Sequence, residues 1–152
     1  MRASDFRDRT AGPLHLVKLA VGAGSFEELR RVRAERLVER GASWVYTRNR
    51  PRREAEVLAG GSLYWVIRGQ IRARQRITGF VTKRDDNGRH YCLIETEAEV
   101  VPTLWRSFRP FQGWRYLPSA DAPPDRIGSD DLAPDAAPPE AMLRELRALG
   151  LL

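Results

Sequence analysis

A basic segment follows two aromatic residues in the first third of this chain. Its members are Trp44 and Tyr46, followed by Arg48, Arg50, Arg52 and Arg53. Bases stack on aromatic rings and guanidinium groups pair with phosphates, so this composition is typical of loops that bind single-stranded nucleic acid. In the alternative interpretation, Trp44 belongs to the core and the arginines are solvated without a ligand.

Three arginines occupy alternate positions of a second segment. A strand over residues 71–81 would place Arg72, Arg74 and Arg76 on one face, ~6.7 Å apart, a row that can follow a nucleic-acid backbone. The alternative is that glutamates across a hairpin neutralise them, which we favour for Arg76 and which leaves Arg72 and Arg74 as candidates. The opposing glutamates would be Glu95, Glu97 and Glu99.

The segment 111–116 combines three aromatic rings with two hydrogen-bond donors. Gln112 and Arg115 are residue types that read base edges, and Trp114 offers a ring for stacking. Alternatively Phe111, Trp114 and Tyr116 fill the core, an explanation that does not account for Gln112 and Arg115.

The sequence contains no recognisable catalytic constellation. His90 and Cys92 share a strand face, but a structural zinc site requires four protein ligands. His15 is the only other histidine, so the sequence offers too few ligands for such a site. The segment 22–24 lacks the pattern and the lysine of a phosphate-binding loop. A Mg²⁺ site at Glu95 and Glu97 would compete with their arginine partners. We therefore expect no catalytic residue, no metal and no cofactor.

Periodicity and turn residues predict the elements that carry these side chains. Strands are expected at 14–19, 43–47, 63–67, 71–81 and 89–101, with a last strand near 114–117. A helix begins after the capping box of Ser25 and Glu28 and ends at Gly41, and a short helix spans 54–59. The apolar face of the first of these helices carries Leu29, Val32 and Leu37. This order predicts an α+β fold: a bent, mostly antiparallel sheet or partly open β-barrel with two or three flanking helices.

The segment 85–88 predicts a hairpin and fixes its register. If Asn87 and Gly88 form a two-residue loop, Asp86 pairs with Arg89. Counting back, Ile77 faces Ala98, Val81 faces Ile94, and Arg76 lies opposite Glu99. The same alternation places Phe80 on the face of the arginines.

Charge is segregated along the chain, which has a formal net charge of +6. Residues 30–76 contain 13 arginines and 4 acids, whereas residues 117–152 contain 7 acids and 3 arginines. We expect a mobile arm at 1–12, a single globular domain at 13–117, an acidic Pro/Ala-rich linker at 118–138 and a short C-terminal helix at 139–152. That helix would place Met142, Leu143, Leu146 and Leu149 on one face.

The sequence also suggests a compartment. A lone cysteine, Cys92, favours a reducing environment, and no apolar run resembles a signal peptide or a membrane span. We expect a cytoplasmic protein without membrane contact.

Four stretches resemble an alphaproteobacterial family catalogued as domain of unknown function 1489. They are residues 14–19, 60–69 (Gly-Gly-Ser-Leu-Tyr-Trp-Val-Ile-Arg-Gly), 73–77 and 110–117 (Pro-Phe-Gln-Gly-Trp-Arg-Tyr-Leu). A helix, a Gly-Gly turn into an apolar strand, and a basic hairpin also resemble the PUA-like group with its EVE and ASCH domains. That resemblance implies a small barrel that binds RNA or modified bases. The implied cleft would include Trp44, the loop 48–53, Tyr64, Trp65 and the turn 112–115.

The leading hypothesis is a non-catalytic module that binds RNA or a modified base. Trp44, Trp65 or Trp114 would stack a base, with Gln112 and Arg115 reading its edge. The basic loop with Arg72 and Arg74 would hold phosphates. One alternative is a module whose basic face meets an acidic protein partner, with the C-terminal helix as docking peptide. Another is a small enzyme for a polyanionic substrate.

Overall fold

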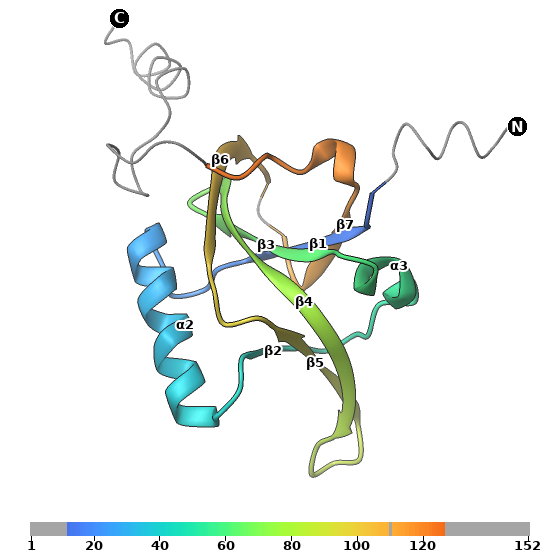
Figure 1. Cartoon of the computed structure of the whole chain (residues 1–152). Helices are drawn as coiled ribbons and strands as arrows, with labels where there is room; N and C mark the ends of the chain where they lie inside the picture. The colour runs from blue at the N-terminus through green and yellow to red at the C-terminus, as the bar shows by residue number, and fades with distance from the viewer. Residues whose placement is uncertain (1–11, 110, 127–152) are drawn as a thin grey trace, which may run out of the picture.

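Seven strands and two helices make up the part of the chain that the computed structural model describes, residues 12–109 and 111–126 (Figure 1). They are β1 (His15–Leu19), α2 (Phe26–Arg40), β2 (Trp44–Thr47), α3 (Glu54–Leu58), β3 (Ser62–Ile67), β4 (Gln70–Arg84), β5 (His90–Thr96), β6 (Val101–Ser107) and β7 (Trp114–Leu117), followed by a 3-10 turn at Ser119–Asp121. The α+β class is confirmed. The expected arm, apart from Gly12, and the expected C-terminal helix lie outside the described residues.

The strands form one bent, open sheet in the order β2-β5-β4-β3-β1-β7, with β6 also paired to β4. Only β1 and β3 run parallel within the described part, so the sheet is mostly antiparallel, as expected. The first half of β4 pairs with β3 and β6, and its second half pairs with β5. Figure 1 shows β4 as the long strand that joins the two halves of the molecule.

A β-bulge between Ile77 and Gly79 changes which side of β4 faces the core. Ile77 is 2% exposed and Phe80 is 8% exposed, although they are three positions apart and strict alternation would place them on opposite faces. The inserted residue reverses the parity, because a bulge places two residues opposite one on the partner strand. The prediction that Phe80 shares the arginine face was therefore wrong.

The hairpin after β4 has a three-residue loop, so the predicted register was wrong by one residue. The Asp85 N–H donates to Arg89 O, and the Asp85 carboxylate accepts from the backbone N–H groups of Asn87 and Arg89. Gly88 adopts φ 79°, the left-handed conformation that closes this loop type. Val81 consequently pairs with Leu93 rather than with Ile94.

The return segment is also divided, which overturns the rest of that register. β5 ends at Thr96, which pairs with Ile77 in place of Ala98. The chain resumes as β6, where Val101 pairs with Arg74. The expected pairing of Arg76 with Glu99 does not form, and the Arg76 carbonyl accepts the Glu97 N–H instead.

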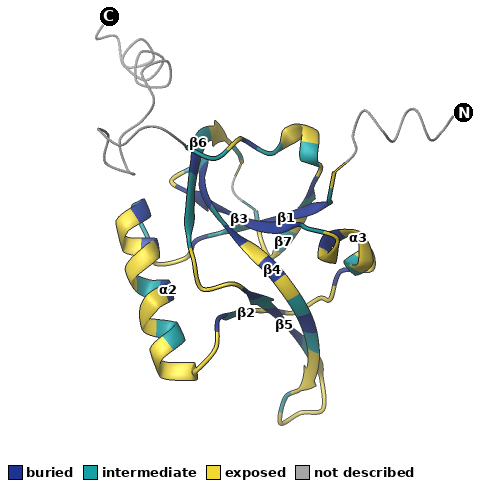
Figure 2. Ribbon diagram, viewed as in Figure 1, coloured by how far each residue is buried: buried dark blue, intermediate teal, exposed yellow. Residues whose placement is uncertain are grey.

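Two apolar clusters cover the two faces of the central strands. β3 alternates between them: Leu63, Trp65 and Ile67 join the larger cluster, whereas Tyr64 and Val66 join the smaller. All six residues of β3 are buried, as its apolar sequence predicted, and Figure 2 shows β1 and β3 as the buried centre of the fold.

Helix α2 has the predicted termini but a different buried face. The Ser25 hydroxyl accepts from the Glu28 N–H, the Glu28 carboxylate accepts from the Gly24 N–H, and the Gly41 N–H donates to Leu37 O. The buried residues are Phe26, Leu29 and Arg33, whereas the expected Val32 and Leu37 are only half-buried. None of the described helices is long and apolar enough to cross a membrane.

The described part of the expected linker packs on the sheet. Asp125 forms a bridge with Thr103, and the Leu104 N–H donates to Pro124 O. Asp125 also accepts two hydrogen bonds of 2.7 Å from Arg74. The folded unit therefore continues to Arg126, past the expected boundary at Leu117.

Substitution of Gly61 tests the junction between α3 and β1. A Cβ atom there would overlap the carbonyl oxygens of Leu14 and Val57, both of which belong to backbone. We expect Gly61→Ala to lower the free energy of unfolding by about 3 kcal/mol, the upper part of the range for overpacking. Gly22→Ala is the control, because its φ of +85° strains alanine by ~1 kcal/mol in open space. Equal losses in urea unfolding of the two variants would contradict the proposed overlap.

Candidate nucleic-acid interface

Three rings project from the outer side of β2 and β5, and we call this surface the aromatic face. Trp44, Tyr46 and Tyr91 form it, while Val45 and Thr47 point into the core. The Tyr46 and Tyr91 rings lie 5.1 Å apart at 32°, and Tyr46 is 47% exposed. Strand alternation produces this separation, because successive side chains leave opposite sides of a sheet.

Cations surround the aromatic face. The Arg40 guanidinium lies 3.7 Å from the Trp44 ring centroid, and the Arg48 guanidinium lies 5.9 Å from that of Tyr46. Lys83 and Arg84 line the same open depression of about 540 Å³ as the three rings. Asp85 also lines it and lies 3.6 Å from Arg48. Asp86 lines it as well, so the surface combines three rings with four positive side chains and two carboxylates.

The basic loop 48–53 continues from this face, and two of its arginines pair with α3. Arg50 donates two hydrogen bonds to Glu54, and Arg53 donates two to Glu56. These bonds raise the pKa of both arginines and lower the pKa of both glutamates. Both pairs are solvent-exposed, so water screens them and a phosphate can compete for the guanidinium groups. Arg52 is exposed and has no ion pair within the described residues.

The structure brings the loop and the segment 111–116 together. Trp114 donates its Nε1–H to Asn49 O at 2.8 Å, and the Tyr116 hydroxyl accepts the Arg53 N–H at 3.1 Å. The two rings contact edge to face, with centroids 4.8 Å apart. Trp114 and Tyr116 therefore hold the loop backbone in place while packing against the larger core cluster.

The two exposed donors of that segment lie outside this contact. Gln112 and Arg115 are both exposed, and the Arg115 guanidinium lies 5.3 Å from the Phe111 ring centroid. Phe111 packs against the smaller core cluster. The predicted edge-reading pair is thus accessible to solvent, with Arg115 supported by an aromatic ring.

Trp65 and Tyr64 lie inside the fold on opposite faces of β3. Trp65 is 4% exposed and donates its Nε1–H to the Gln75 Oε1, so its ring has no free surface for a base. The Arg33 guanidinium lies 5.7 Å from the Trp65 ring and donates to Trp44 O. Burial, together with Arg40 and Arg36, lowers the pKa of Arg33 to about 10.

Arg72 and Arg74 have internal partners. Arg72 is 8% exposed and lies 3.7 Å from the Trp105 ring centroid. Arg74 binds Asp125 and donates to the Ser62 hydroxyl at 2.9 Å, and the bonds to Asp125 raise the pKa of Arg74. The carboxylate that neutralises this strand face therefore comes from the segment expected to be a linker.

A polar cluster near the start of β1 looks like a serine–histidine pair, but its hydrogen bonds run in the wrong direction. His15 Nδ1 accepts the Ser62 N–H at 2.9 Å, so the proton of the neutral ring sits on Nε2. That Nε2–H faces the Ser119 hydroxyl at 3.2 Å, and the hydroxyl donates to Pro13 O. A nitrogen that already carries a proton cannot accept one from Ser119, so the arrangement does not activate a nucleophile.

The described residues contain no cluster of three histidine, cysteine or acidic side chains that could hold a metal. The Glu95 carboxylate lies against the backbone of Gly79, and Glu97 is exposed beyond the end of β5.

Sequence reasoning missed four residues of this interface: Arg40, Lys83, Arg84 and Tyr91. Tyr91 alternates along β5 with the buried residues Cys92 and Ile94. Its outward direction therefore follows from the sequence alone. Its position beside Tyr46 depends on the pairing of β2 with β5, which joins segments far apart in the chain. The alternation was available in the sequence, and the pairing was not.

The buried His15 makes the stability of the fold depend on pH. Burial, with a contribution from Arg74, lowers the pKa of His15 from 6.5 to about 4, so the folded state binds fewer protons than the unfolded state between these values. The contribution of the neutral His15 ring to the free energy of unfolding is complete above pH 6.5. It is lost as the pH falls towards 4, which lowers the free energy of unfolding by about 3 kcal/mol. His15→Asn keeps an acceptor for the Ser62 N–H without titrating.

Chemical denaturation of both proteins from pH 7.5 to 4 measures this effect. The free energy of unfolding of the unmodified chain should fall more steeply than that of His15→Asn. His90→Asn, a change at an exposed histidine, should follow the unmodified chain. Parallel profiles for the His15 variant and the unmodified chain would refute the assignment.

Comparison with known proteins identifies a family but no characterised relative. No curated protein and no solved structure matches the chain, so the PUA-like resemblance stays a prediction. A family model described as "Protein of unknown function (DUF1489)" matches residues 16–152, which includes every strand of the sheet almost in full. The chain therefore belongs to the DUF1489 family.

Proposed function

We propose that the protein binds single-stranded RNA, without catalysing a reaction on it, through the aromatic face and the adjoining basic loop. The observation that carries this proposal is the group of three outward rings, Trp44, Tyr46 and Tyr91, bordered by four cations. Base–aromatic stacking contributes ~1–3 kcal/mol per base, and cations beside the rings contact the phosphates that join the bases.

The geometry suits unpaired bases rather than a duplex. Rings on an open strand surface are accessible only to bases whose faces are free, and the paired bases of a duplex stack on each other. The Arg40 guanidinium lies 3.7 Å from the Trp44 ring centroid, and its planar group offers a further stacking surface for a base. Tyr46 and Tyr91 are neighbours across two strands, so bases placed on them would be adjacent.

The basic loop extends the positive surface beyond the rings. Arg48 belongs to both, because it begins the loop and lies beside Tyr46. Arg52 has no carboxylate partner among the described residues, so binding a phosphate would break no ion pair there. Arg72 and Arg74 contribute less to this proposal, because a ring and a carboxylate already occupy them.

Fluorescence anisotropy with labelled single-stranded RNA, single-stranded DNA and duplex DNA tests the proposal. Tyr46→Ala with Tyr91→Ala should lower the affinity for single-stranded RNA by ~10-fold or more at every salt concentration. The double Tyr→Phe variant should bind like the unmodified chain, because it keeps both rings. No binding at low salt, or equal loss in the phenylalanine variant, would overturn the proposal.

Arginine substitutions distinguish the contribution of phosphate contacts from that of base stacking. Each lost phosphate contact reduces the slope of log K against log salt by ~0.7 for a single strand. We expect that reduction in Arg48→Ala and in Arg52→Ala. Arg31→Ala is the matched control, since Arg31 is an exposed arginine on α2, and it should leave the slope unchanged. An equal change in the control would point to diffuse charge attraction in place of a defined interface.

A further inference from the structure

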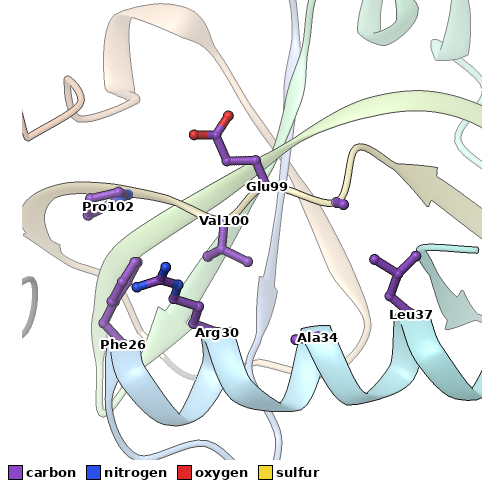
Figure 3. A pocket seen from close by; sticks show the side chains of 8 residues that line it. Phe26, Arg30, Ala34, Leu37, Glu99, Val100 and Pro102 are labelled. Atoms are coloured by element: carbon purple, nitrogen blue, oxygen red, sulfur yellow. The ribbon is translucent and has the colours of Figure 1, made fainter.

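A groove runs between α2 and the segment that joins β5 to β6 (Figure 3). Its volume is about 420 Å³, and it is lined by Phe26, Arg30, Ala34 and Leu37 on the helix and by Ala98, Glu99, Val100 and Pro102 opposite. The four helix residues recur at intervals of three or four, so they form one stripe along α2. Figure 3 shows Val100 pointing towards the helix and Glu99 pointing away from it.

Part of the apolar surface of α2 is not covered by any described residue. Leu37 is half-buried, Ala34 is exposed, and the adjacent Val38 is 84% exposed. Figure 2 shows most of α2 as exposed. Apolar side chains gathered on one side of a helix mark a surface that a further element covers.

The described chain ends beside this groove. The N–H of Arg126, the last described residue, donates to the carbonyl of Pro102, which lines the groove. The 12 residues from 127 to 138 can span up to ~40 Å, whereas a helix of the length of α2 is only ~22 Å long. Residues 139–152 can therefore reach any part of the groove without strain.

The sequence of residues 139–152 matches the groove in polarity. Met142, Leu143, Leu146 and Leu149 recur at helical spacing, as an element that fills an apolar stripe requires. Glu145 and Arg147 flank this apolar face on its two sides, so they can pair with Arg30 and Glu99 at the groove. The family match extends to Leu152, so this segment is part of the sequence that defines the family.

We propose that residues 139–152 bind as a helix in the groove between α2 and residues 98–102 of the same chain. The tether keeps the segment at an effective concentration in the millimolar range, so even modest affinity fills the groove. Occupation would cover Ala34, Leu37 and Val100. This inference does not depend on RNA binding, because the groove and the aromatic face are lined by different residues.

Hydrogen–deuterium exchange of the full chain tests the proposal from both sides. The backbone amides of residues 141–150 should exchange roughly ten times more slowly in the unmodified chain than in Ala34→Glu, which places a carboxylate in the groove. Conversely, Leu146→Glu with Leu149→Glu should accelerate exchange of the α2 amides. Ala34 is exposed on its helix, and glutamate is a good helix former, so the substitution spares the fold.

The matched control is Ala55→Glu, the same substitution at an exposed position of α3. It should leave exchange of residues 141–150 unchanged. Rapid exchange of these amides in the unmodified chain would overturn the proposal, as would an equal effect of the control. Protection that declines on dilution would also overturn it, because the groove would then be filled by the segment of a second copy.

Discussion

The fold depends on one strand that must satisfy backbone hydrogen bonds on two differently oriented parts of the sheet. β4 donates to and accepts from β3 and β6 along its first half and β5 along its second. The bulge between Ile77 and Gly79 lets the strand turn while keeping both Ile77 and Phe80 in the core. The three-residue hairpin sets the register of β5 against β4, and the pairing of β5 with β2 places Tyr91 beside Tyr46.

The number of arginines in the sequence is larger than the number of guanidinium groups that are exposed at the described surface. Arg33, Arg72 and Arg74 are wholly or partly buried, and each lies against a ring or an oxygen acceptor. Burying a guanidinium group requires such partners, because the charge loses its hydration. Exposed cations border β2, the loop 48–53 and the β4–β5 hairpin, and others lie elsewhere on the described surface, among them Arg30, Arg31, Arg68, Arg76, Arg106 and Arg109. Charge counted along the sequence therefore located the basic half of the chain, but not its accessible part.

Sequence signals were reliable for features that are determined by residues close together in the chain. Ser25, Glu28 and Gly41 fixed both ends of α2, and the apolar run 63–67 identified the central strand, because caps and burial act within a few residues. Pairing between distant segments could not be deduced. The Asp85 carboxylate, by accepting two backbone N–H groups, favours a three-residue loop over the expected two-residue loop, and this displaced the whole predicted register. The role of Asp125 was invisible for the same reason: its partner, Arg74, is distant in sequence.

The two ends of the open sheet are joined by the basic loop, which explains why arginines and aromatic residues gather there. β2 and β7 are the first and last strands in the order of the sheet, and neither has a second neighbour along it. The loop leaves β2 and meets β7 through the bonds from Trp114 to Asn49 O and from the Arg53 N–H to Tyr116. An unpaired strand edge exposes backbone groups that attract other strands, and charged residues beside the edge oppose such pairing. Arginine at this seam therefore opposes pairing with other strands, and the same positive charge is what the proposed binding of RNA requires.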